Sequence, residues 1–88
     1  MDQKTLDKLN NIQASLQDLH NSQVAVMNKA AQLETTLMNS PDKAVEDELV
    51  AVYADASDAA DKLNHMLDDI NDRVDKANKE FTPPEEQE

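Results

Sequence analysis

The residues of this chain that could take part in chemistry are two histidines and many carboxylates. His65 is followed by Asp68 and Asp69, a spacing that places the three side chains on one face of a helix. An imidazole beside carboxylates could hold a divalent cation, but zinc sites use three or four well-directed ligands. His20 is expected beside the line of contact between the helices, whereas His65 is expected on the outer face. We therefore predict no metal site.

Catalytic chemistry finds no better support in the sequence. The chain has no cysteine, which removes a thiolate nucleophile and a disulfide framework. No serine or threonine stands beside a base in a recognisable motif, and no carboxylate lies in an apolar stretch that would raise its pKa for acid–base catalysis. We expect a protein that is not an enzyme, with no catalytic residue, no cofactor and no small-molecule substrate.

The strong negative charge restricts the partners. Nineteen acidic residues against eight basic ones give a formal net charge of −11. Nucleic-acid affinity comes mainly from lysine and arginine side chains that neutralise phosphates, and anionic membranes attract basic segments for the same reason. Direct binding to nucleic acid or to a membrane is therefore not expected.

The acidic residues are concentrated in the second half of the chain, where several recur at heptad spacing along one side of a predicted helix. A row of carboxylates roughly 10 Å apart, at about 1.5 Å per residue, could imitate a phosphate backbone and occupy the basic groove of a nucleic-acid-binding protein. The other interpretation is that outward positions of any soluble helix are polar. The residues of this acidic face are Asp47, Asp58, Asp61, Asp68, Asp72 and Asp75.

The elements that position these side chains are two long helices. The sequence has no glycine, no tryptophan, one tyrosine and one phenylalanine, so an all-α fold is favoured over a β fold. In the first half, apolar residues with one polar interruption alternate in steps of three and four, the pattern of a helix that packs lengthwise on another helix. They are Leu9, Ile12, Leu16, Leu19, Gln23, Val26, Ala30, Leu33 and Leu37.

The second half carries two apolar rows. The first row has the same three-and-four spacing, at Val45, Leu49, Val52, Ala56, Ala59, Leu63, Met66 and Ile70. A second row lies beside it, at Tyr53, Ala60, Leu67, Val74 and Phe81. This face is wider than one neighbouring helix needs, so the second helix is expected to contact two or more neighbours.

The break between the helices is a tight turn. Asn39 can adopt the left-handed conformation that ends a helix, Ser40 is a favoured N-cap, and Pro41 suits the first helical position. We predict helix 1 at about residues 3–38, a turn at 39–41 and helix 2 at about 41–80, with a disordered acidic tail at 82–88 after the hairpin of residues 1–81. So short a turn makes the helices antiparallel.

Folding at Ser40 predicts which residues face each other. Leu19 should meet Leu63, Leu16 should meet Met66, and Ile12 should meet Ile70. The half of the hairpin far from the turn then carries the large side chains and should be the better packed. Nearer the turn, alanines on the second helix bury less apolar area.

Two helices cannot cover each other's apolar faces, so we predict that two hairpins associate into a four-helix bundle. Gln23 is then either a polar layer that sets the register or a side chain that reaches solvent. A different helical protein could use the same face in place of a second copy. The predicted interface residues are Leu49, Val52, Tyr53, Ala56, Ala60, Leu63, Leu67, Val74 and Phe81.

Three functions fit this sequence. The favoured one is a non-catalytic, self-associating interaction module, and the second is an acidic mimic that inhibits a nucleic-acid-binding protein. The third is a secretion chaperone or co-secreted helical partner. The outline is similar to that of WXG100-type secreted proteins, but the turn lacks their Trp-x-Gly. With no apolar signal segment, we expect a cytoplasmic protein and leave signal-independent secretion open.

Overall fold

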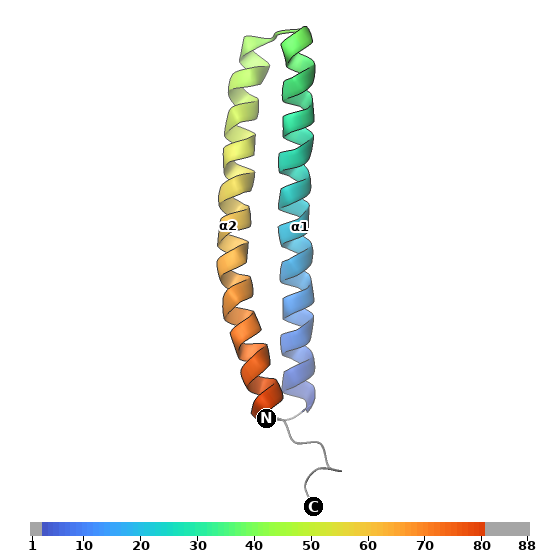
Figure 1. The fold of residues 1–88 in the computed structure, drawn as a ribbon, viewed down its shortest axis with the longest axis vertical. Helices are drawn as coiled ribbons and strands as arrows, with labels where there is room; N and C mark the ends of the chain where they lie inside the picture. Colours follow the sequence, from blue (N-terminus) through green and yellow to red (C-terminus); the bar gives the residue numbers. More distant parts are fainter. Residues whose placement is uncertain (1–2, 81–88) are drawn as a thin grey trace, which may run out of the picture.

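The protein is a hairpin of two long antiparallel helices. The computed structural model describes residues 3–80, with α1 at Gln3–Asn39 and α2 at Lys43–Glu80. The two helices lie side by side along their whole length and are joined by a short turn at one end (Figure 1). The predicted all-α hairpin is confirmed. Phe81 and the predicted tail at 82–88 lie outside the described residues.

The molecule is a rod. Its principal-axis extents are 70 × 16 × 14 Å and its radius of gyration is 19.9 Å. A compact domain of this length would have a radius of gyration of about 12 Å. A pair of helices that is only one layer thick has no interior shielded on all sides, so every residue outside the contact between the helices faces solvent or a partner.

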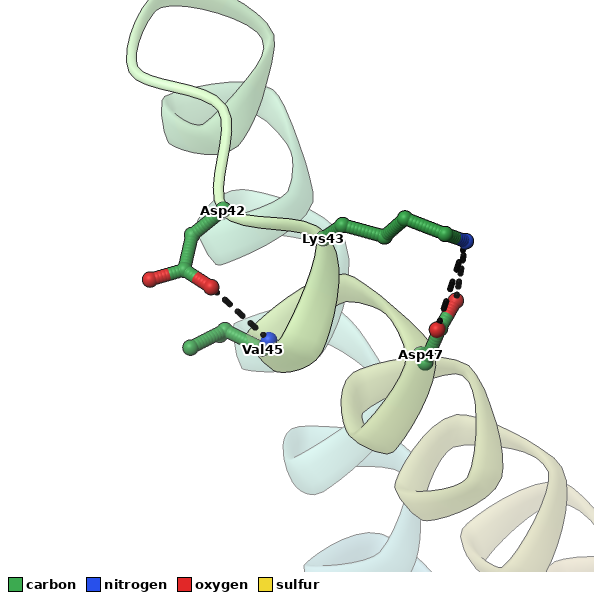
Figure 2. Close-up of polar contacts among 4 residues, drawn as sticks. All are labelled: Asp42, Lys43, Val45 and Asp47. Atoms are coloured by element: carbon green, nitrogen blue, oxygen red, sulfur yellow. Dashed lines mark hydrogen bonds and ion pairs between the residues drawn. The ribbon is translucent and has the colours of Figure 1, made fainter.

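Asp42 caps the start of α2. Its Oδ1 accepts a hydrogen bond of 3.2 Å from the backbone N–H of Val45 (Figure 2). Its carbonyl accepts the first helical hydrogen bond, from the backbone N–H of Glu46 at 2.9 Å. This is the geometry of an N-cap residue bonded to the third residue of its helix. The cap is therefore Asp42 and not Ser40, and α2 begins two residues later than the sequence suggested.

The end of α1 also differs from the prediction. The last helical hydrogen bond runs from the backbone N–H of Ser40 to the carbonyl of Thr36, at 3.1 Å. No residue between 3 and 80 has a positive φ, so Asn39 does not close the helix in the left-handed conformation. Pro41 disfavours a helical conformation at the preceding residue, so the helix ends at Ser40 without a residue in the left-handed conformation.

The larger side chains gather in the half of the hairpin far from the turn, as predicted. The buried cluster there joins Leu6, Leu9 and Leu16 of α1 to the opposing residues of α2, with Ile12 and Leu63 packed against it. Across the same half, Gln13 Nε2 donates a hydrogen bond to Asn71 Oδ1. The α2 members of the cluster are Leu67, Ile70, Val74 and Ala77.

The line of contact between the helices is not the predicted one. Leu16 is only 8% exposed, whereas Leu19 and Met66 are each 50% exposed although both were expected to be buried. We call the positions that face the other helix the seam. On α1 the seam residues are Leu6, Leu9, Gln13, Leu16, His20, Gln23, Met27, Ala30 and Leu37. On α2 they are Glu46, Leu49, Tyr53, Ala56, Ala60, Leu63, Leu67, Ile70, Val74 and Ala77, of which Tyr53 alone stays largely exposed.

A charged residue accounts for this choice. Continuing the first apolar row of α2 by one step after Ile70 brings Arg73 into the contact, and burying an unpaired guanidinium is costly. Using the second row instead places Val74 and then Ala77 between the helices, and these are 6% and 0% exposed. The residues at the end of the hairpin far from the turn therefore determine which rows form the seam along the whole rod.

The half of the hairpin near the turn is thinly packed. Its buried side chains are Ala30 and Leu37 on α1 and Ala56 and Ala60 on α2. Alanine contributes little apolar area, so this half adds less to stability than the leucine-rich half.

Replacing Val74 by alanine should lower the free energy of unfolding by about 2 kcal/mol, because it removes two buried methyl groups and leaves a cavity. Val50 is 63% exposed on the same helix, so Val50→Ala is the matched control and should change stability by less than about 0.5 kcal/mol. Urea denaturation followed by circular dichroism measures both. Equal losses would show that the seam is misplaced.

The two candidate caps can be separated by substitution. Asp42→Ala should cost about 1 kcal/mol of stability because the N–H of Val45 loses its acceptor, and Asp42→Asn should cost less because it keeps one. Ser40→Ala should have almost no effect. A larger loss from Ser40→Ala than from Asp42→Ala in the same denaturation experiment would contradict the assignment of the cap.

Candidate interaction surface

Each helix carries an exposed apolar stripe just beside the seam. On α1 the stripe residues recur every seven positions, and on α2 an equivalent stripe does the same. Most of these side chains are between 39% and 50% exposed. We call the two stripes together the apolar flank. Its residues are Ile12, Leu19, Val26 and Leu33 on α1 and Val45, Val52, Ala59 and Met66 on α2, of which Ile12 and Ala59 are half-buried.

The two stripes lie on the same side of the hairpin. Seven of the eight stripe residues directly precede a seam residue, as Leu19 precedes His20 and Met66 precedes Leu67. The two stripes are therefore rotated from the seam by the same angle and in the same sense about their helices. Because the helices run in opposite directions and face each other, equal rotations bring both stripes to one side of the pair. The result is a continuous apolar surface made by both helices.

The opposite side of the hairpin is different in character. Far from the turn it is amide-rich, with Asn10, Gln17, Asn64 and Asn71 among its residues. Near the turn it holds an open groove that combines apolar side chains with three carboxylates. The residues lining this groove are Ala30, Glu34, Met38, Glu46, Asp47, Leu49, Val50 and Tyr53.

The structure divides the predicted interface residues between two environments. Ala56, Ala60, Leu67 and Val74 are buried against α1 within the single chain, so they are not available to a second copy while the hairpin is intact. Leu49 and Leu63 are half-buried in the same seam. Val52 and Tyr53 are exposed at 47% and 42%. Val52 belongs to the apolar flank, Tyr53 lines the groove, and Phe81 lies outside the described residues.

The predicted interface contains Val52 alone of the eight flank residues and none of the four on α1. Ile12, Leu19, Val26 and Leu33 were assigned to the contact between the helices, because their spacing fits a seam as well as the true one does. The signal that separates the two choices is Arg73, which interrupts one row of α2 just where the other continues with Val74. Placing that arginine outside the contact would have left these four residues free for a partner.

All six residues of the predicted acidic face are exposed. Lys43 Nζ lies 3.4 Å from a carboxylate oxygen of Asp47, and Lys62 Nζ lies 3.1 Å from Asp58. Figure 2 shows the first of these pairs on the opening turn of α2. Such exposed pairs between consecutive turns contribute little to stability. The binding of a basic partner by this face stays a prediction.

The two histidines occupy unlike places. His65 is exposed, and residues 3–80 contain no group of three or more histidine or carboxylate side chains arranged to hold a metal ion. His20 is a half-buried seam residue whose Nδ1 is shielded from solvent and makes no hydrogen bond within the described chain. Gln23 is also half-buried in the seam. The seam thus half-buries two polar side chains while leucine and valine stay exposed beside it.

Neither helix of the described chain has an apolar stretch long enough to cross a membrane. The cytoplasmic location expected from the sequence stays a prediction. No family model matches the chain, and comparison with curated proteins and with solved structures finds no match either.

The unpaired nitrogen of His20 leads to a stability prediction. His20→Leu should raise the free energy of unfolding by about 1 kcal/mol, because it removes a buried polar atom that lacks a partner and adds apolar contact in the seam. His65→Leu is the matched control on an exposed position and should change it by less than about 0.5 kcal/mol. Thermal or urea denaturation at neutral pH measures both. A loss of stability in His20→Leu would mean that this nitrogen has a partner.

Proposed function

We propose that this protein is a non-catalytic interaction module whose hairpins pair through the apolar flank to form a four-helix bundle. The observation that carries the proposal is the flank itself: eight apolar residues from two helices on one side of a rod. Isolated exposed apolar residues are normal on protein surfaces, but a contiguous patch of this kind is typical of an interface.

The distribution of apolar residues supports a bundle in particular. A helix in a two-stranded coiled coil needs two apolar positions in every seven. Helices of a four-helix bundle use a third, adjacent position, which faces a second neighbour. Both α1 and α2 have this wider face, and the hairpin leaves the third position of each helix uncovered. The pattern of apolar residues is therefore that of helices in a four-helix bundle, although each helix of the hairpin contacts one neighbour instead of two.

A second candidate function rests on the other side of α2. Asp61, Asp68 and Asp75 are exposed and make no hydrogen bond or ion pair within residues 3–80. They leave a row of uncompensated charge that a basic protein could bind. In that case neutralising the three together would abolish binding to the basic partner, and substitutions in the flank would leave it intact.

Paired substitutions on opposite sides test the proposal. Val26→Lys with Val52→Lys places two charges in the flank and should convert the dimer to a monomer. The control is Val24→Lys with Val50→Lys, which uses the same residue types two positions earlier and on the other side of the rod; Val24 is 37% exposed and Val26 is 39%. Light scattering coupled to size-exclusion chromatography measures the mass of each.

The control variant should remain dimeric, and both variants should keep their helical circular dichroism. If the control dissociated and the flank variant did not, the groove near Tyr53 would be the interface and the proposal would be wrong. A monomeric wild-type chain would remove the proposal altogether.

A further inference from the structure

A second copy can dock on the apolar flank in two symmetric ways. A two-fold axis along the rod places α1 on α2 of the other copy, with both turns at the same end. An axis across the rod places α1 on α1 and α2 on α2, with the turns at opposite ends. We propose the first arrangement. This inference rests on the proposed function and adds to it which helix of the partner each helix recognises.

The flank has the shape and size that either arrangement requires. The stripe on α1 runs from residue 12 to residue 33 and the stripe on α2 from 45 to 66, and the Gln13–Asn71 contact places residues 12–33 opposite 72–51, so the two stripes overlap over most of their length. Each covers about 32 Å at about 1.5 Å per residue. With helix axes about 10 Å apart, the face is roughly 20 Å wide and presents on the order of 600 Å². Stable interfaces bury about 600 to 1,000 Å² on each partner, so the flank lies at the lower end of that range.

Charge decides between the two arrangements. Within its bounds α1 has three acidic and three basic residues and is neutral, whereas α2 has eleven acidic and five basic residues, a net charge of −6. An axis across the rod would place the two α2 helices against each other along their length. An axis along the rod places each α2 against a neutral α1, which avoids this repulsion.

The residues bordering the flank agree with this choice. Lys29 lies between the levels of Val26 and Leu33 on α1, and Asp55 lies between Val52 and Ala59 on α2, so each is next to its stripe on the helix surface. With the axis along the rod, Lys29 of one copy comes level with Asp55 of the other. Asp55 lies at the midpoint of the α2 stripe, so with the axis across the rod it approaches Asp55 of the other copy.

In the proposed arrangement, Lys8 of one copy also comes level with Lys76 of the other, and the two carry like charges. They lie beyond the end of the flank, past Ile12 and Met66, where no apolar contact holds the two copies together.

The amide-rich side opposite the flank offers no second stripe of this length. Pairing flank to flank therefore closes the assembly at two copies, as a two-fold contact does.

The position of the turns distinguishes the arrangements directly. The chain has no cysteine, so Ser40→Cys in the exposed turn, at the top of Figure 1, accepts a single spin label. Pulsed electron paramagnetic resonance on the full chain should give a label-to-label distance below about 35 Å. Turns at opposite ends would separate the labels by roughly 50 Å or more, at about 1.5 Å per residue.

Asn21→Cys, at mid-height on α1, is the control for labelling and should give a short distance in either arrangement. A short distance at both positions supports the proposal. A short distance at residue 21 with a long one at residue 40 overturns it and leaves the proposed function intact. The absence of any distance from a monomeric chain at residue 21 overturns the inference together with the proposed function.

Discussion

A helix packed against one neighbour can cover about two of every seven positions, and both helices of this protein are apolar at three. The structure has to leave one apolar line of each helix in the open. It covers the line of Leu9 and Leu16 on α1 and the line of Ile70 and Val74 on α2. It exposes the apolar flank, which includes Leu19. The apolar flank follows from that division, because the uncovered lines fall on the same side of an antiparallel pair.

The choice of lines is made at one end of the rod. Arg73 keeps its row out of the contact, while the small Ala77 lets the helices meet closely beyond it. The consequence reaches the middle of the hairpin, where His20 and Gln23 are drawn into the seam and Leu19 and Val26 are not. The seam that keeps Arg73 out of the contact at one end thus places polar side chains in the contact further along the hairpin. In the proposed dimer, the second copy covers the apolar residues that the seam excludes.

Much of the fold could be predicted from the sequence, and the part that could not has a physical reason. Steps of three and four predict helices, and Ser40 followed by Pro41 predicts the turn. The same steps fit either of two adjacent pairs of lines, so Leu16 and Leu19 look equally suited to the seam although only Leu16 is buried. Asp42 and Ser40 are both good capping residues, and the structure alone shows which of them bonds to the N–H of Val45. Of the eight flank residues, only Val52 is among the predicted interface residues, for the same reason.

The central claim is that a second copy completes the core of this protein. The dependence of the melting temperature on protein concentration tests it most directly, because unfolding coupled to dissociation is favoured by dilution. Circular dichroism melts of the wild-type chain over a hundredfold range of concentration, from about 1 to about 100 µM, should show a rise of roughly 5 to 10 °C. A melting temperature that stays constant over that range would show that the single hairpin is the folded unit and would contradict the account.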